Sequence, residues 1–340
     1  MVDVTVGIKA LNEEKHIAEA LRSALEATAS VEGEVILADS GSTDRTIAIA
    51  EQYESVRIFQ LANPHERSCG VGAQLAFQHA RGRYFYILDG DMVLSPVFMK
   101  AGIEFLERNA EFAAVGGIVE QVNLDGEEYR IRQAVAEQDA GWQPGIVDRL
   151  DCGGLYRTSA ISELGYFADR NLHSFEEFEL GARLRSRGWK LARLNIPAVK
   201  HYGHTTGGYR LLQRRFKSGY IDGAGEVFRS AIGHKHVFDV FKRLGHIPYG
   251  IVTLLWWLLV VCLIVFAPVY AAIVALVSFG LLCVRRKSVQ LGLYSFVMWN
   301  IYAIGLVRGF FRTRSSPTKP IASVEHRRTP SESAHASVKT

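Results

Sequence analysis

The chain has 340 residues, of which 48% are apolar and 22% charged, enough for one large globular domain or two smaller ones. Its net charge of +4 is too small to indicate a nucleic-acid-binding protein. None of the four cysteines belongs to a CxxC pair, which argues against a zinc knuckle or a disulfide framework.

Composition divides the chain into three parts. Residues 1–232 have the mixture of apolar and polar side chains that is typical of a globular domain, whereas residues 247–284 contain no Asp, Glu, Lys or Arg. Residues 313–340 are poor in large apolar side chains and rich in Ser, Thr, Pro and basic residues. We therefore predict a globular domain at 1–232, a membrane region at 233–312 and a disordered tail at 313–340.

The first third of the chain alternates between two kinds of segment. Short β-prone apolar runs are followed by segments in which apolar residues recur at helical spacing. Strict alternation of this kind, with short loops, predicts a doubly wound α/β sheet with right-handed crossovers. The predicted strands are residues 2–8, 34–38, 56–59 and 84–88, and the predicted helices begin near Asn12, Asp44, Arg67 and Pro96.

The pattern loosens after residue 112. Further strands are predicted, which would make the sheet mixed, and a basic amphipathic stretch comes last. The predicted strands are residues 113–119, 152–156 and 191–196, with a variable loop and helix region at 125–148, a helix at 174–187 and one or more basic helices at 209–232.

The apolar run at residues 248–284 is long enough for two membrane helices, because one crossing needs about 20 residues. We predict these helices at 248–266 and 268–284, with the basic residues 285–287 back on the cytosolic side. A third segment at 289–309 is less apolar. If it crossed the membrane, the basic tail would end outside, so an interfacial or re-entrant helix is favoured and a spanning one stays open.

The N-terminus enters a strand pattern at once and has no signal-peptide pattern. Basic residues gather around the apolar segments, a placement that suits an anionic cytoplasmic membrane face. The globular domain is therefore expected in the cytosol, beside a membrane.

Acidic side chains follow the predicted strands. Asp39 comes after the second strand, and Asp89 and Asp91 flank Gly90 after the fourth. Ligands of open α/β sheets bind at the carboxyl ends of the strands. Two carboxylates one residue apart can direct oxygen atoms at one hard cation and, through it, at phosphate. Taken alone, these acids also fit an ordinary solvated turn.

Five motifs occur in order along roughly residues 3–230. They are Lys9-Ala10-Leu11-Asn12-Glu13-Glu14, Asp39-Ser40-Gly41-Ser42-Thr43-Asp44-Arg45-Thr46, Asp89-Gly90-Asp91, Gly153-Gly154-Leu155-Tyr156-Arg157, and Glu176-Glu177-Phe178-Glu179-Leu180 with Arg183. In order and spacing these motifs resemble the family 2 glycosyltransferases, which are inverting enzymes. The resemblance implies the Rossmann-like mixed sheet of the A-type glycosyltransferase fold and a nucleotide-sugar donor.

The resemblance also implies which residues contact the nucleotide. Asp39 would hold the base, since a carboxylate can accept an N–H of uracil or guanine. Ala10, Asn12 and Glu13 match the first nucleotide contact, although Asn12 is equally an ordinary helix N-cap. Arg67 lies in a loop where the family places a basic or polar group near the nucleotide.

By the same resemblance, Asp89 and Asp91 would bind the metal and the diphosphate. A Mg²⁺ or Mn²⁺ ion would neutralise the departing nucleotide diphosphate. Asp91 is favoured as the direct ligand, and Asp89 as a helper at the ribose or through water. His201 or His204 could be a third contact, with His201 favoured by the family pattern; a histidine that only closes a strand is the alternative.

Inversion requires a base that removes the proton of the acceptor hydroxyl. The acidic pair of the family, typically Glu-Asp, is Glu176-Glu177 here, and its second member is the predicted base. The extra methylene of Glu177 departs from the pattern. Ser174 to Glu177 also form a capping-box sequence, which would turn Glu177 back onto the helix and leave Glu176 facing the site.

Two further features bear on the substrates. Gly153 and Gly154 are expected to let the backbone approach the donor sugar or the acceptor. The Gln-x-x-Arg-Trp motif of processive polysaccharide synthases is absent, because the chain has Gln213-Arg214-Arg215-Phe216-Lys217 at this place. This basic helix is expected to lie on the membrane instead, and acceptor recognition is expected within residues 120–175.

Together these features predict a membrane-anchored, metal-dependent glycosyltransferase of hexosyltransferase type at a bacterial inner membrane. Its acceptor would be a membrane-associated, most economically polyprenyl-linked, saccharide in exopolysaccharide or glycolipid assembly. The alternatives are an enzyme that loads polyprenyl phosphate directly and a non-catalytic sugar-nucleotide-binding scaffold. A nucleotidyltransferase is disfavoured, because no Gly-rich loop with a lysine follows the first strand.

Overall fold

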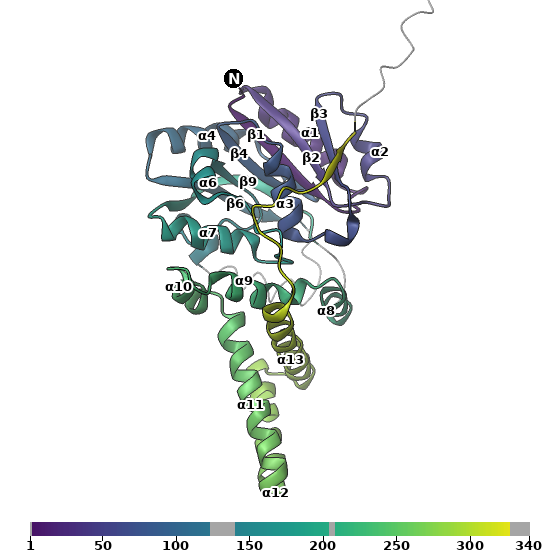
Figure 1. Ribbon diagram of the computed structural model, residues 1–340, viewed down its shortest axis with the longest axis vertical. Helices are drawn as coiled ribbons and strands as arrows, with labels where there is room; N and C mark the ends of the chain where they lie inside the picture. The colour runs from purple at the N-terminus through teal and green to yellow at the C-terminus, as the bar shows by residue number, and fades with distance from the viewer. Residues whose placement is uncertain (1, 123–139, 204–207, 327–340) are drawn as a thin grey trace, which may run out of the picture.

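The computed structural model describes residues 2–122, 140–203 and 208–326 (Figure 1). Most of the predicted variable region at 125–148, and His204, lie outside these residues. A layered α/β domain forms one end of the molecule, and a group of long helices projects from its base (Figure 1).

A mixed sheet forms the centre of the domain. In its parallel half β1 lies between β2 and β4, and β3 lies outside β2. These strands are apolar almost throughout because both faces of a parallel sheet are covered by helices. The predicted doubly wound A-type fold is confirmed. The bounds are β1 (Val4–Ala10), β2 (Gly33–Asp39), β3 (Val56–Leu61) and β4 (Tyr84–Asp89).

The other half of the sheet contains antiparallel pairs. β8 is antiparallel to β4 and β6, β9 is parallel to β6, and β5 and β7 both pair with β9. As a result, the ends of β1, β2 and β4 and the β5–β9 pair lie along one edge. The bounds are β5 (Met92–Leu94), β6 (Phe112–Gln121), β7 (Gly145–Val147), β8 (Gly154–Arg157) and β9 (Lys190–His201).

Helices cover both faces of the sheet and enclose one core on each. α1, α2 and α4 pack on one face, and α3, α6 and α7 on the other. The bounds are α1 (Ile17–Ala29), α2 (Thr46–Ala50), α3 (Cys69–Gln78), α4 (Pro96–Arg108), α6 (Thr158–Leu164) and α7 (Glu176–Ser186), with short turns η1 (Pro64–Glu66) and η2 (Ala140–Trp142).

A layer of short helices separates this domain from the long helices (Figure 1). One of these helices, α9, shares a third core with α10 and with parts of α7, α11 and α13. The bounds are α8 (Gly208–Lys217), η3 (Tyr220–Asp222), α9 (Gly223–Ala231) and α10 (Val237–Arg243).

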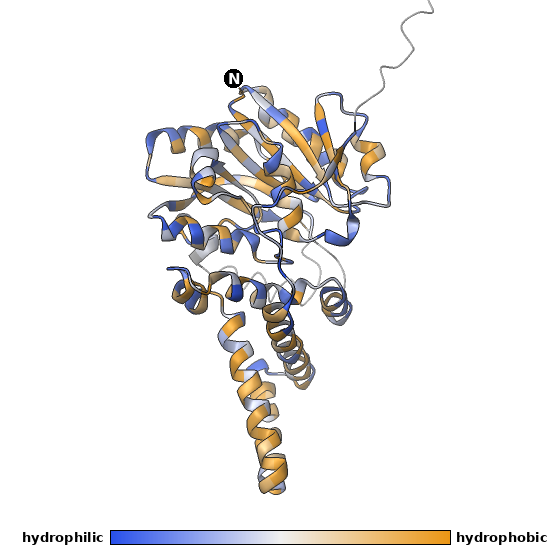
Figure 2. Cartoon of the chain, viewed as in Figure 1, coloured by the Kyte–Doolittle hydropathy of each residue, from blue (hydrophilic) through white to orange (hydrophobic). Residues whose placement is uncertain are grey.

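The last three helices are each long and apolar enough to cross a membrane. They are α11 (His246–Phe266), α12 (Pro268–Arg286) and α13 (Val289–Phe311), close to the predicted segments. α11 and α12 form a hairpin that points away from the domain and is apolar over most of its surface (Figure 2). α13 instead packs on the domain base, where Arg308 forms an ion pair of 2.7 Å with the buried Asp222. The favoured interpretation of α13 as an interfacial or re-entrant helix stays a prediction, with a spanning helix as its alternative.

The predicted disordered tail is wrong for residues 313–326, which we call the C-terminal strap. This segment runs from α13 along the domain, and its strand β10 (Ser323–Glu325) pairs antiparallel with β3. Ile321 is buried in the core beside α3, and its backbone N–H and C=O both bond to the Gln78 side chain. The polar composition of the strap did not indicate an ordered segment. One buried apolar side chain, Ile321, and pairing with the edge strand β3 are sufficient to hold the strap in place.

Candidate active site

A lysine at the end of β1 lies among three carboxylates. Lys9 Nζ is 2.8 Å from Glu176 Oε1, 3.1 Å from Asp89 Oδ1 and 3.5 Å from Glu177 Oε1. The register of β1 and β4 sets Lys9 beside Asp89, and α7 begins with the two glutamates. Lys9 is absent from the predicted site residues. The signal was a lysine near the end of a mostly apolar strand, because a buried lysine needs charged partners.

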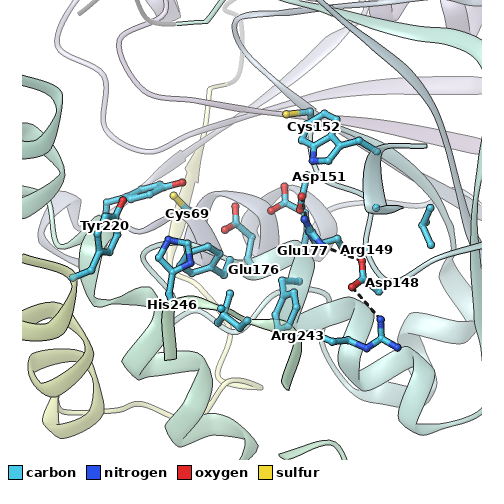
Figure 3. Close-up of a pocket in the computed structure, with 18 of the residues that line it drawn as sticks. Cys69, Asp148, Arg149, Asp151, Cys152, Glu176, Glu177, Tyr220, Arg243 and His246 are labelled. Carbon is cyan, nitrogen blue, oxygen red and sulfur yellow. Dashed lines mark hydrogen bonds and ion pairs between the residues drawn. The ribbon is translucent and has the colours of Figure 1, made fainter. Parts of the chain in front are cut away.

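The start of α7 differs from the predicted capping box. Phe175, the residue before the helix, has φ 65°, and no side chain caps the helix. Ser174 Oγ donates to the Tyr220 carbonyl oxygen at 2.7 Å instead. The capping-box alternative is therefore wrong, and both Glu176 and Glu177 project into the site (Figure 3).

The two glutamates have different surroundings. Only 4% of the Glu176 side chain is exposed, and it forms the shorter ion pair with Lys9. Burial, followed by the neighbouring Glu176, raises the pKa of Glu177 to about 8. Burial alone would lower the pKa of Lys9, but the nearby carboxylates outweigh it and hold that pKa well above its usual range. Glu177 can therefore exchange a proton near neutral pH, as a general base does.

Carboxylates also gather around the glycine between Asp89 and Asp91. Glu13 packs over Gly90 so closely that a Cβ there would lie 2.9 Å from Glu13 Cγ. Burial and then the charges of Asp91 and Asp89 raise the pKa of Glu13 to about 7. His201 Nε2 lies 3.5 Å from Asp91 Oδ2, because β5 pairs with β9.

This excess of negative charge suits a cation. In the part of the chain that the structure describes, no three His, Cys, Asp or Glu side chains form a ready-made metal cluster. Asp91 and His201 together offer a carboxylate and an imidazole. They fit a Mg²⁺ or Mn²⁺ ion that takes its other ligands from phosphate and water, as such ions do at nucleotide sites.

Asp39 is fully buried at the end of β2 and is held by one of its two oxygens. Oδ2 accepts hydrogen bonds of 2.9 Å from the N–H groups of Gly41 and Ser42 and from the Gln60 side chain. Among the described residues, Oδ1 has no partner. A buried acceptor held in this way is suited to an N–H donor of a ligand.

Asn12 is not the predicted helix N-cap. α1 begins at Ile17, and Asn12 has φ 58°. Its Oδ1 accepts from the Thr43 N–H at 2.8 Å, and its own N–H donates to Ser42 Oγ at 2.8 Å. Asn12 therefore ties the loop after Ala10, the last residue of β1, to the turn that holds Asp39.

The remaining predicted site residues are less closely tied to these acids. Arg67 is exposed in the loop before α3. Gly153 has φ 99°, and a Cβ there would lie 2.8 Å from the Tyr86 hydroxyl, while a Cβ on Gly154 would lie 2.9 Å from Leu150. Packing inside the domain explains why both positions are glycine. The approach of their backbone to a donor sugar or an acceptor stays a prediction.

A pocket of about 1140 Å³ lies between the carboxylates of Glu176 and Glu177 and the first and last long helices. Asp89, Glu176 and Glu177 line its domain side, whereas Asp39 and Asp91 are not part of its wall. Arg149, Arg185 and Arg243 lie along one side, paired with Asp148, Asp151 and Asp239. Aromatic side chains of α11 and α13 also line the pocket, namely His246, Tyr249, Trp299 and Tyr302, of which Figure 3 labels His246.

Comparisons with known proteins give a consistent result. A family model described as Glycosyl transferase family 2 matches residues 5–165. EpsE of Bacillus subtilis, whose name assigns it to the glycosyltransferases, is 30% identical over 200 residues, which cover 56% of this chain and 68% of EpsE.

A second relative matches nearly the whole chain. It is the dolichyl N-acetyl-α-D-glucosaminyl phosphate 3-β-D-2,3-diacetamido-2,3-dideoxy-β-D-glucuronosyltransferase of Methanococcus voltae, 19% identical over 330 residues, 92% of this chain and 98% of that protein. Among solved structures, the mannosyltransferase PcManGT of Pyrobaculum calidifontis, in complex with GDP-Man and Mn²⁺, is similar with a TM-score of 0.59. The two proteins are 16% identical, and the match covers 91% of this chain and 87% of PcManGT. At this identity the similarity supports the fold alone.

Proposed function

This chain belongs to glycosyl transferase family 2, and on that basis we propose that it is a membrane-anchored enzyme that extends a lipid-linked saccharide by one sugar. One observation carries the choice of acceptor. The pocket joins the carboxylates Glu176 and Glu177 to aromatic side chains of α11 and α13, so an acceptor in it touches both the catalytic edge and the apolar helices.

The donor is a nucleotide diphosphate sugar. Its base would donate an N–H to Asp39 Oδ1, beside the loop of Ala10, Asn12 and Glu13, with Arg67 at the rim. Asp89 would contact the ribose, directly or through water. A Mg²⁺ or Mn²⁺ ion at Asp91 and His201 would supply positive charge to the diphosphate. A nucleotide sugar and a divalent ion are also what the structurally similar PcManGT holds in its complex with GDP-Man and Mn²⁺.

Glu177 is the proposed base. The acceptor hydroxyl oxygen forms a bond to the anomeric carbon of the donor, and the bond from that carbon to the nucleotide diphosphate breaks with inversion. The hydroxyl proton passes to a carboxylate oxygen of Glu177. Lys9 forms an ion pair with Glu176 beside it and moderates the rise in the pKa of Glu177.

Several features support a lipid carrier. The Methanococcus voltae relative, which matches nearly the whole chain, has a dolichyl-linked sugar phosphate in its name. Sugars stack on aromatic faces such as those of Tyr249 and Trp299, whose rings are 6.0 Å apart at the pocket. Basic residues around the helices suit an anionic lipid surface. We place the domain in the cytosol at a bacterial inner membrane, in polysaccharide or glycolipid assembly.

Product analysis tests this proposal. The full-length protein in lipid nanodiscs would receive UDP- and GDP-sugars, Mn²⁺ and either polyprenyl-diphosphate-linked saccharide or plain polyprenyl phosphate. We expect the saccharide to gain one sugar and polyprenyl phosphate to stay unchanged. Transfer to polyprenyl phosphate alone would instead identify an enzyme that loads the carrier, and no consumption of any donor would contradict the proposal.

A further inference from the structure

The C-terminal strap connects α13 to the far edge of the sheet. Near its start Arg314 forms an ion pair of 2.5 Å with Asp169, which is fully buried. Farther along, Arg170 Nη1 donates to the carbonyl oxygen of Lys319 at 3.0 Å, and Ile321 is buried beside α3. The strap is therefore an integral part of the folded domain.

The end of the strap lies along β3, near the residue of β3 that contacts Asp39. The His326 backbone N–H donates to the Ile58 carbonyl at 3.0 Å, and its ring Nε2 is 3.3 Å from Gln60 Oε1. A carboxamide oxygen can only accept, so Nε2 donates in this contact. The amide nitrogen of Gln60 then faces Asp39 Oδ2 at 2.9 Å. His326, Gln60 and Asp39 thus form a chain of hydrogen bonds.

These linked hydrogen bonds bear on which oxygen of Asp39 is left for a ligand. Gln60 lies directly beside Asp39 in the register of β2 and β3 and provides the side-chain donor among the three donors to Oδ2. If the Gln60 amide turned over, its oxygen would face the carboxylate, and two acceptors would repel each other. The donor on His326 favours the orientation that holds Oδ2 and leaves Oδ1 available.

We propose that the C-terminal strap completes the nucleotide-base subsite, and that His326 is a positioning residue acting on the base through Gln60 and Asp39. The inference rests on the proposed function, since it requires Asp39 to accept an N–H from the base. It adds a structural element that lies 266 residues away from Gln60 in the sequence. The strap directly follows α13, so one continuous segment links the membrane region to donor binding.

The test measures binding of UDP and GDP, each with Mn²⁺, to the full-length protein in nanodiscs by calorimetry. His326→Ala removes the hydrogen bond to Gln60 and also the 3.4 Å contact of His326 Nδ1 with the exposed Glu51. Loss of the bond to Gln60 should weaken the better-bound nucleotide about two- to tenfold. Inorganic pyrophosphate with Mn²⁺ does not reach Asp39, so its affinity should stay unchanged. The donor KM of the transfer reaction should rise with the Kd, while kcat stays the same.

Conservative and control variants separate positioning from a general loss of structure. In His326→Gln the amide nitrogen occupies the place of Nε2, so affinity should recover. His326→Asn is too short to reach Gln60 and should resemble the alanine variant. Ser323→Ala removes another contact of the C-terminal strap, the 3.1 Å bond between Ser323 Oγ and His79, and should leave nucleotide affinity unchanged.

The outcomes are distinct. If wild-type protein binds UDP or GDP but His326→Ala binds it equally well, the inference is wrong and the proposed function stands. An equal loss of pyrophosphate affinity would also overturn it, because the effect would not pass through the base. Failure of the wild-type protein to bind either nucleotide would instead contradict the proposed function itself.

Discussion

The ammonium group of Lys9 lies 2.8 Å from a carboxylate oxygen of Glu176, in a site where only 4% of the Glu176 side chain is exposed. In the proposed mechanism, this ion pair gives the two adjacent acids Glu176 and Glu177 different roles. Glu176 is neutralised by its partner, whereas Glu177, at 3.5 Å from the same ammonium, has the raised pKa that a base needs near neutral pH.

Replacing Lys9 with methionine should destabilise the protein. The change keeps most of the side-chain volume but leaves Glu176 buried without its cation, which typically costs about 3–5 kcal/mol. Chemical denaturation in detergent would measure the loss. Lys190→Met is the control, because its partner Glu111 and Lys190 itself are about half exposed, at 52% and 49%. Equal stability of the two variants would contradict this role of Lys9.

The pH dependence of transfer should report Glu177. A base acts only when deprotonated, and the pKa of this carboxyl is raised to about 8, so kcat/KM should rise with pH through that region. In Lys9→Met the rise should move to higher pH, because the ammonium normally lowers the pKa of Glu177. A rate that already reaches its plateau near the ordinary glutamate pKa would contradict the assignment. The measurement is kcat/KM at saturating Mn²⁺ from acid to alkaline pH.

Asp91→Asn should weaken nucleotide binding only when a divalent cation is present. Loss of a partner that only orients a metal ligand typically costs about ten- to a hundredfold in affinity, so loss of a direct ligand should cost at least as much. Calorimetry with UDP and GDP, in Mn²⁺ and separately in EDTA, would measure the effect. A Kd that is the same for wild type and variant in Mn²⁺ would rule out Asp91 as a ligand, and an equal loss in EDTA would point to misfolding.

Trp299→Ala should raise the acceptor KM and leave the donor Kd unchanged. Trp299 lines the pocket and stacks on Tyr249. An aromatic contact is worth about 0.5–1.5 kcal/mol, which corresponds to about two- to tenfold in KM. Trp256→Ala is the matched control, since this residue bonds to Ser278 between α11 and α12 and is not part of the pocket wall. Similar effects of both variants would contradict an acceptor role for the pocket.

Much of the fold could be predicted because its signals are local. The apolar run from Tyr84 to Leu88 specifies a buried strand wherever it pairs, and the acids after it are adjacent in sequence. The alternation of such runs with helices fixes a parallel sheet, and acids that follow its strands converge at one edge. The sequence signal for the apolar helices near residues 248–309 was equally local.

The rest depends on contacts between distant segments. Lys9 meets its carboxylates only through the register of β1 and β4 and the approach of α7, and Gln60 meets His326 across 266 positions. At Phe175 a left-handed residue overrode a capping sequence that is sound by itself. At Asn12, likewise, a contact with a distant segment prevailed over a local pattern. Its side chain accepts a hydrogen bond from the Thr43 N–H and does not cap a helix.

The most direct test of the account compares Glu177→Gln with Glu176→Gln in the transfer of a radiolabelled sugar to lipid-linked saccharide in nanodiscs. Loss of the base should lower kcat about a hundred- to ten-thousandfold in Glu177→Gln, with the Kd for UDP or GDP unchanged. Glu176→Gln should retain more activity and lose stability instead. Full turnover by Glu177→Gln, with donor binding intact, would contradict the proposed mechanism.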